Sequence, residues 1–290
     1  MKNTLLLLFV TMTAFSFAQK NKTKQAETST AKPFVLGVID EIQSKELGEK
    51  RVVNIYLPEG YNPNDSIKYP VIYLLDGSAD EDFIHVAGLV QFYNFDWVNV
   101  VPKSIVVGIA TVDRQRDFTF PTTIEEQKKR FPKTGHSKEF LAFIEKELQP
   151  FMASKYKATT DKTLIGQSLG GLFATHVLLT KPELFNRYII ISPSLWWDHG
   201  SLLKADSKLL TEEFNRKTDI YIGVGQEGLT PTDPPQVMEV DANLLYYKVK
   251  EGKSPNIKVS FEYLPLENHA TIMHQALMHA FQVLYPQKAE

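Results

Sequence analysis

Short runs of β-branched and aromatic residues alternate with longer segments in which apolar residues recur at a spacing of three to four. The short runs predict strands, and the longer segments predict helices. Eight strands are expected, at residues 34–42, 51–57, 69–75, 104–109, 163–166, 187–191, 219–224 and 257–264. Helices are expected at residues 81–93, 137–152, 171–180, 237–249 and 270–284.

The connections between these elements indicate how the strands pair. A short polar turn at residues 47–49 joins the first two strands, which predicts an antiparallel hairpin. Helical segments separate the later strands, so these pair in parallel through right-handed crossovers. The sequence therefore predicts one α/β unit with a mostly parallel sheet and helices on both faces. Residues 111–135 and 194–215 show no clear period, and we expect irregular loops there that shape a substrate pocket or lid.

The N-terminal residues have the pattern of a secretory signal. Lys2 gives a positive start, residues 5–10 form an apolar core, and Ser16 and Ala18 form a small-x-small cleavage site. This apolar core is too short to cross the roughly 30 Å hydrocarbon layer of a membrane. We expect residues 1–18 to be a signal peptide, 19–32 a flexible spacer and 33–290 a single domain of a periplasmic or secreted protein.

Composition narrows the function classes. The formal net charge is -2 and no dense stretch of Lys and Arg occurs, so neither nucleic acid nor an anionic membrane is an expected partner. The lack of cysteine excludes a lipoprotein anchor, disulfides, thiolate metal sites and a cysteine nucleophile. We expect a small-molecule ligand and no cofactor, and the oligomeric state stays open.

The segment Gly166-Gln167-Ser168-Leu169-Gly170 lies between a β-branched run and an amphipathic stretch. This is the context of a nucleophile elbow, a strained strand-to-helix turn that projects a serine hydroxyl above the sheet. Small residues two positions either side let the strand and the helix approach closely. The backbone N–H of Leu169, at the start of the helix, is then a candidate donor to an oxyanion.

A second oxyanion donor is expected from the loop after the third strand. There, Asp76-Gly77-Ser78 ends an apolar run with a glycine turn. The N–H of Ser78 is the candidate, with Gly77 as the alternative. Asp76 is also a residue type that caps such turns.

Ser168 needs a general base and a carboxylate that orients this base. In α/β hydrolases the chain order is serine, acid, histidine. His269 fits because it follows the last strand, whereas His274 and His279 fall inside the next helix and His199 comes too early. The three late histidines are five residues apart, so they lie on different faces of a helix and no metal site is expected.

The sequence defines the acid less sharply. Glu227 lies at the carboxyl end of the seventh expected strand and is the first candidate. Asp233, Glu239 and Asp241 follow, in a stretch long enough to fold any of them back. A Ser-His pair without a carboxylate is a further alternative.

Some side chains are candidates to contact substrate. Arg114 and Arg116 follow the fourth strand and suit an anionic oxygen, or they pair with neighbouring aspartates. Trp196, beside Trp197, suits the wall of a pocket, or it packs the loop. His85, in the helix after the oxyanion loop, is expected to approach the site from the other side.

With these pieces placed, the chain resembles the putative-esterase family of α/β hydrolases, which includes enterochelin and salmochelin esterases, feruloyl esterases and S-formylglutathione hydrolases. The resemblance spans residue 34 to the C-terminus. It rests on five segments, which are RVVNIYLPEGY at 51–61, YPVIYLLDG at 69–77, DRQRDF at 113–118, GQSLGG at 166–171 and ISPSLWWD at 191–198.

The resemblance implies an α/β-hydrolase fold, Ser168 as nucleophile, His269 as base and an acyl-enzyme intermediate. It is strongest to the siderophore-esterase-like branch, in which some members are described as Ser-His pairs. The sequence thus predicts an exported serine esterase that acts on siderophore-like, carbohydrate or aromatic esters. The alternatives are an acyltransferase on the same scaffold and a non-catalytic periplasmic binding protein.

Overall fold

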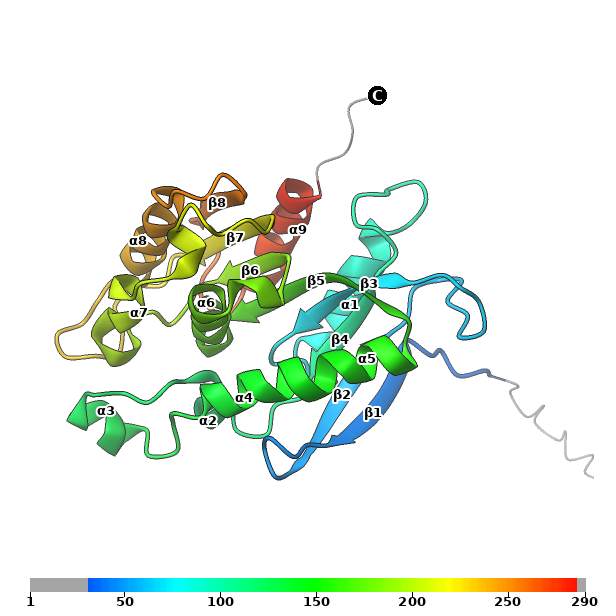
Figure 1. Cartoon of the computed structure of the whole chain (residues 1–290), viewed down its shortest axis with the longest axis horizontal. Coiled ribbons are helices and arrows are strands. Elements are labelled where there is room, and N and C mark those ends of the chain that lie inside the picture. The colour runs from blue at the N-terminus through cyan, green and yellow to red at the C-terminus, as the bar shows by residue number, and fades with distance from the viewer. Residues whose placement is uncertain (1–30, 286–290) are drawn as a thin grey trace, which may run out of the picture. The chain divides into compact units, whose positions relative to one another are not determined.

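Eight strands form one sheet in the computed structural model, which describes residues 31–285 (Figure 1). The strand order is β1-β2-β4-β3-β5-β6-β7-β8. The bounds are β1 Gly37–Gln43, β2 Lys50–Tyr56, β3 Tyr69–Leu74, β4 Ile105–Ile109, β5 Ala158–Gln167, β6 Arg187–Ile191, β7 Thr218–Gly225 and β8 Ile257–Leu264. The predicted signal peptide and nearly all of the predicted spacer lie outside the described residues.

The pairing agrees with the predicted fold class. β1 and β2 form the expected antiparallel hairpin, β2 also pairs antiparallel with β4, and the pairs from β4 to β8 are parallel. β5 begins five residues before its predicted start. Its first half is polar and only partly buried, so the sequence shows no apolar run there. Residues 36–285 form one compact unit, and residues 31–35 are grouped apart from it.

Helices cover both faces of the sheet. The pleat sends Val53, Ile55 and Tyr73 to one face and Tyr56, Ile72 and Leu74 to the other. The second set packs on α1 (Phe83–Tyr93) and α9 (Ile272–Leu284). The first set packs under α4 (Ser137–Phe143), the π-helical turn η1 (Ile144–Leu148), α5 (Gln149–Lys155), α6 (Leu169–Thr180) and α8 (Met238–Lys250).

The two stretches predicted as irregular contain short helices, so that prediction was wrong. The first holds α2 (Arg114–Phe118) and α3 (Glu125–Arg130), and the second holds η3 (Trp197–Gly200), α7 (Ser201–Lys204) and η4 (Lys208–Leu210). The turn η2 (Pro182–Leu184) follows α6. Helices of three to six residues are too short for a 3.6-residue period to show in the sequence. Within residues 31–285, no helix combines the length and the apolar character needed to span a bilayer.

Candidate active site

Ser168 occupies a sharp turn between β5 and α6. Its φ of 58° and ψ of -121° lie in a region that side-chain-bearing residues rarely adopt. The crossing is tight, since a Cβ on Gly166 would come within 2.3 Å of the carbonyl oxygen of Gly170. Glycine at position 166 therefore lets the strand and the helix close this turn and present the serine at the carboxyl edge of the sheet.

His269 and Glu227 meet at the same edge. The Nδ1 atom of His269 lies 2.5 Å from Oε2 of Glu227, and the Ser192 hydroxyl donates to the other carboxylate oxygen. The side chain of Glu227 is 1% exposed, whereas that of His269 is 44% exposed. Burial alone would raise the pKa of Glu227, but the hydrogen bonds from His269 and Ser192 hold this pKa below its ordinary value. The carboxylate is therefore ionised and faces the imidazole.

The rival acids lie elsewhere. Asp233 lines a separate cavity with His199 and Trp196. Glu239 accepts hydrogen bonds from the backbone N–H groups of Glu227, at 2.8 Å, and of Gly228, so it positions the loop that carries Glu227. Asp241 is 7% exposed within α8, and its Oδ2 has no hydrogen-bond partner among the described residues.

Ser168 and His269 line one cavity of about 420 Å³, which we call the Ser-His cavity. Its other lining residues are Asp76, Glu81, Asp82, Arg114 and Gln167. The Ser168 hydroxyl lies 3.4 Å from that of Ser194, and the structure records no hydrogen bond between Ser168 and His269 among its described residues. Catalytic hydrogen bonds of this kind often tighten only when substrate binds.

The two predicted oxyanion donors differ in their surroundings. The N–H of Leu169 begins α6 and has no acceptor among residues 31–285. The N–H of Gly77 donates to the carbonyl of Ile109 at 3.0 Å, which removes the alternative that the sequence left open. The N–H of Ser78 has no acceptor within the described chain, so the loop after β3 offers this group.

The predicted arginines have different positions. Arg114 donates to both oxygens of Asp76, at 3.0 and 2.9 Å, and lines the Ser-His cavity. The structure does not bring Arg116 to the site, because Glu49 and Asp117 hold its guanidinium. This corrects the expectation that both arginines reach substrate. The pairing partner of Arg114 is Asp76 rather than a neighbouring aspartate.

Of the two remaining substrate-contact candidates, Trp196 lines a cavity beside Ser168 and His85 does not. Trp196 is 8% exposed and lines a second cavity, of about 260 Å³, that also contains Ser168 and Leu169. We call it the aromatic cavity, since Phe131 and Trp197 complete that wall. His85 does not line either cavity. It contacts His274 at 2.7 Å and Asp82 at 3.1 Å, and only Asp82 reaches the Ser-His cavity.

Sequence reasoning missed Ser192, the second partner of Glu227, and Ser194, the neighbour of Ser168. Ser192 directly follows β6, and Ser194 comes two residues later. The signal was available, because the carboxyl ends of adjacent parallel strands meet at one edge, where ligands bind. In the part of the chain that the structure describes, no group of three or more His, Asp or Glu side chains has the arrangement of a metal site.

Comparisons with known proteins identify the family of the chain. A family model described as "putative esterase" matches residues 44–248. The chain is 28% identical over 269 residues to the ferri-bacillibactin esterase BesA of Bacillus subtilis, covering 88% of this chain and 92% of that protein.

Solved structures show the same fold. The IroE-like serine hydrolase from Shewanella oneidensis superposes with a TM-score of 0.73 at 30% identity, covering 86% of this chain and 80% of the other. The BES protein from Bacillus cereus gives a TM-score of 0.71 at 27% identity, covering 90% and 100%. The similarity therefore extends over nearly all of the described domain.

Proposed function

Because the chain belongs to the putative-esterase family and is a carboxylic ester hydrolase, we propose that it cleaves esters through an acyl-enzyme on Ser168. The observation that carries the proposal is the Ser-His cavity, which joins the strained Ser168 to a histidine already oriented by a buried carboxylate. His269 is the general base, and Glu227 is the orienting acid.

The hydrogen bond to Glu227 sets the tautomer of His269. Since Nδ1 faces the carboxylate, Nε2 is the nitrogen that takes the proton from Ser168. The serine oxygen attacks the ester carbonyl, and the proton passes from Nε2 to the departing alkoxide. Water then repeats the sequence on the acyl-enzyme, and the acid is released.

The N–H groups of Leu169 and Ser78 stabilise the negative charge on the tetrahedral intermediate. Both are free of acceptors in the described residues, and the dipole of α6 adds to the field at Leu169. Removing one donor of this kind costs about 10²- to 10³-fold in kcat in other hydrolases.

The positions of the two cavities orient the substrate. The alcohol leaves on the side of His269, which must protonate it, and this side is the Ser-His cavity. The acyl group then lies in the aromatic cavity, which contains Ser168 and Leu169 and is not lined by His269. Arg114 lines both cavities and is placed to contact either part of the substrate.

For the substrate we propose siderophore-type esters first, with aromatic and carbohydrate esters as the next classes. This proposal is supported by the similarity to the ferri-bacillibactin esterase, which covers 88% of this chain. The aromatic wall of the acyl side suits a planar acyl group. We further propose export to the periplasm or medium, supported by the signal pattern at residues 1–18.

The test is hydrolysis of p-nitrophenyl acetate and butyrate by the mature protein and by Ser168→Ala, with fluorophosphonate labelling and peptide mapping. We expect the label on Ser168 and turnover that disappears in Ser168→Ala. A folded protein that neither turns over nor takes the label contradicts the mechanism and favours a binding protein. Siderophore, feruloyl and acetylated-sugar esters then rank the substrate classes.

A further inference from the structure

Gln167 connects the nucleophile elbow to the loop that carries the base. It is the last residue of β5 and directly precedes Ser168. Its side-chain Nε2 donates to the backbone carbonyl oxygen of His269 at 2.5 Å, across 102 positions of sequence. Gln167 is half-buried, and it lines the Ser-His cavity together with Ser168 and His269. One side chain thus links the nucleophile to its base.

The orientation of this amide follows from its partner. A carbonyl oxygen only accepts hydrogen bonds, so the NH₂ end of Gln167 must face His269. Within residues 31–285, no backbone group outside the regular helices and strands donates to or accepts from the backbone of His269. The Gln167 amide therefore provides the hydrogen bond that holds the backbone of the base.

The elbow gives Gln167 a rigid starting point. The N–H of Ser168 donates to the carbonyl of Ile191 at 3.0 Å, and the carbonyl of Ser168 accepts from the N–H of Ser194 at 3.0 Å. These bonds tie the elbow to β6 and to the segment that follows it. Gln167 itself lies opposite Ile191 in the parallel pairing of β5 with β6. A side chain that starts from this position holds its partner in a constant place.

The loop between β8 and α9 carries His269, and separate residues hold separate parts of it. Glu227 holds the ring of His269 through Nδ1. The carbonyl of Glu267 accepts from the N–H of Gln226 at 2.7 Å, which ties the loop to the end of β7 two residues before the base. The rotation of the ring and the position of the backbone are thus fixed independently, and Gln167 fixes the second.

The distance between base and nucleophile decides how readily the proton moves. A displacement of the loop changes the distance that the proton must cross from Ser168 to His269. A misplacement of about 1 Å can cost on the order of 10²-fold in rate. Because β6 holds the elbow, the loop that carries His269 is the part that shifts when the Gln167 amide is lost.

We propose that Gln167 is a positioning residue for the general base, which sets the distance between His269 and Ser168 through its hydrogen bond to the His269 carbonyl. This rests on the proposed function, in which His269 takes the proton of Ser168. Gln167 acts through His269 and not on the ester itself, so its loss lowers kcat and leaves KM nearly unchanged.

The test uses Gln167→Met, which keeps the length of the side chain and removes the donor. We expect kcat for p-nitrophenyl acetate to fall about tenfold, with KM within about twofold of the unmodified protein. Gln167→His should recover most of this loss, because Nε2 of histidine lies as many bonds from the backbone as Nε2 of glutamine and also carries a hydrogen in one tautomer. Gln226→Met is the matched control, since the Gln226 side chain is exposed, and it should keep full activity.

A double-mutant cycle separates positioning of the base from a general structural role. In Glu227→Ala the ring of His269 is already released, so adding Gln167→Met should lower kcat only about twofold further. A general structural role would cost the same factor in both backgrounds. Circular dichroism and thermal melting establish that each variant is folded, and Gln167→Leu replaces Gln167→Met if it is not.

An unchanged kcat in Gln167→Met, an equal loss in Gln167→His, or the same factor in both backgrounds overturns the positioning role. Turnover of p-nitrophenyl acetate that persists in Ser168→Ala would instead overturn the proposed function, so the two failures are distinct.

Discussion

Glu227 presents one carboxylate oxygen to His269 and is itself almost fully buried, whereas nearly half of the His269 side chain is exposed. The carboxylate is fixed further by the Ser192 hydroxyl and by Glu239, which holds the backbone of the same loop. A rigid buried acid and an accessible imidazole are the arrangement that a general base requires. The base can reach substrate while its ring orientation is held from behind.

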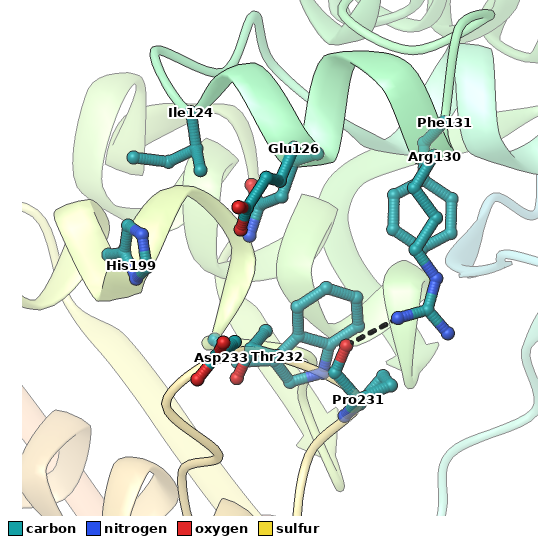
Figure 2. A pocket seen from close by; sticks show the side chains of 10 residues that line it. Ile124, Glu126, Arg130, Phe131, His199, Pro231, Thr232 and Asp233 are labelled. Atoms are coloured by element: carbon teal, nitrogen blue, oxygen red, sulfur yellow. Dashed lines mark hydrogen bonds between the residues drawn. The ribbon is translucent and has the colours of Figure 1, made fainter.

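Replacing Glu227 by alanine should therefore lower kcat for p-nitrophenyl acetate on the order of 10²- to 10⁴-fold, with a small change in KM. The orientation of His269 and the stabilisation of its charged form would both be lost. Steady-state kinetics measures this effect. Asp233→Asn is the control, because Asp233 lines a separate cavity with His199 and Trp196 (Figure 2). A larger loss from Asp233→Asn than from Glu227→Ala would show that Asp233 is the acid and would contradict the role of Glu227.

Sequence patterns predicted the sheet well because its strands are short runs rich in β-branched and aromatic residues. The predicted bounds of β6 and β8, residues 187–191 and 257–264, match the structure. The elbow was equally visible, since the close approach of β5 and α6 requires glycine at position 166, two residues before Ser168. These features depend on local sequence, and local sequence was sufficient to find them.

The partners in the site depend on contacts between distant segments, and no local pattern encodes them. Asp76 follows β3 and Arg114 begins α2, and their pairing is visible only after β3 and β4 are placed side by side. The choice among Glu227, Asp233, Glu239 and Asp241 was open for the same reason. It depends on how the loop after β7 folds back.

The elbow also makes a prediction about stability. In Gly166→Ala the new Cβ would lie 2.3 Å from the carbonyl oxygen of Gly170, so the strand or α6 must shift. We expect a loss of about 2 kcal/mol or more in the free energy of unfolding, together with lower activity. Urea denaturation and p-nitrophenyl acetate hydrolysis measure the two effects.

Gly88→Ala is the matched control. Gly88 lies within α1, and a Cβ there meets no atom within 4 Å. Alanine in a helix interior is favoured over glycine by up to about 1 kcal/mol, so this variant should be slightly more stable and fully active. Equal destabilisation by the two substitutions would show that close packing at the elbow is not the cause.

His176 makes stability fall in acid. Burial lowers the pKa of His176 to about 4, from an ordinary value of 6.5, and its ring contacts the Ser137 hydroxyl at 3.0 Å. The neutral form belongs to the folded state, so this contribution is complete above pH 6.5 and is lost as the pH falls through 4, up to about 3 kcal/mol. His176→Gln should flatten that part of the urea-unfolding profile.

The control for this profile is His136→Gln, because the side chain of His136 is 55% exposed. That variant should keep the acid-dependent loss. An unchanged profile in His176→Gln would show that other groups cause the loss.

Asp241 works in the opposite direction. It is buried in α8, and burial raises its pKa to about 6, from an ordinary value of 3.8. The folded state therefore holds the proton more tightly than the unfolded state, and stability is lost as the pH rises from about 4 through 6, by up to about 3 kcal/mol. Asp241→Asn removes the ionisation, so at pH 8 it should unfold at higher urea concentration than the unmodified protein, with the difference shrinking towards pH 4.

Because Asp241 lies apart from His269, kcat for p-nitrophenyl acetate should not change. A stability difference that is the same at both pH values, or a large fall in kcat, would contradict this role.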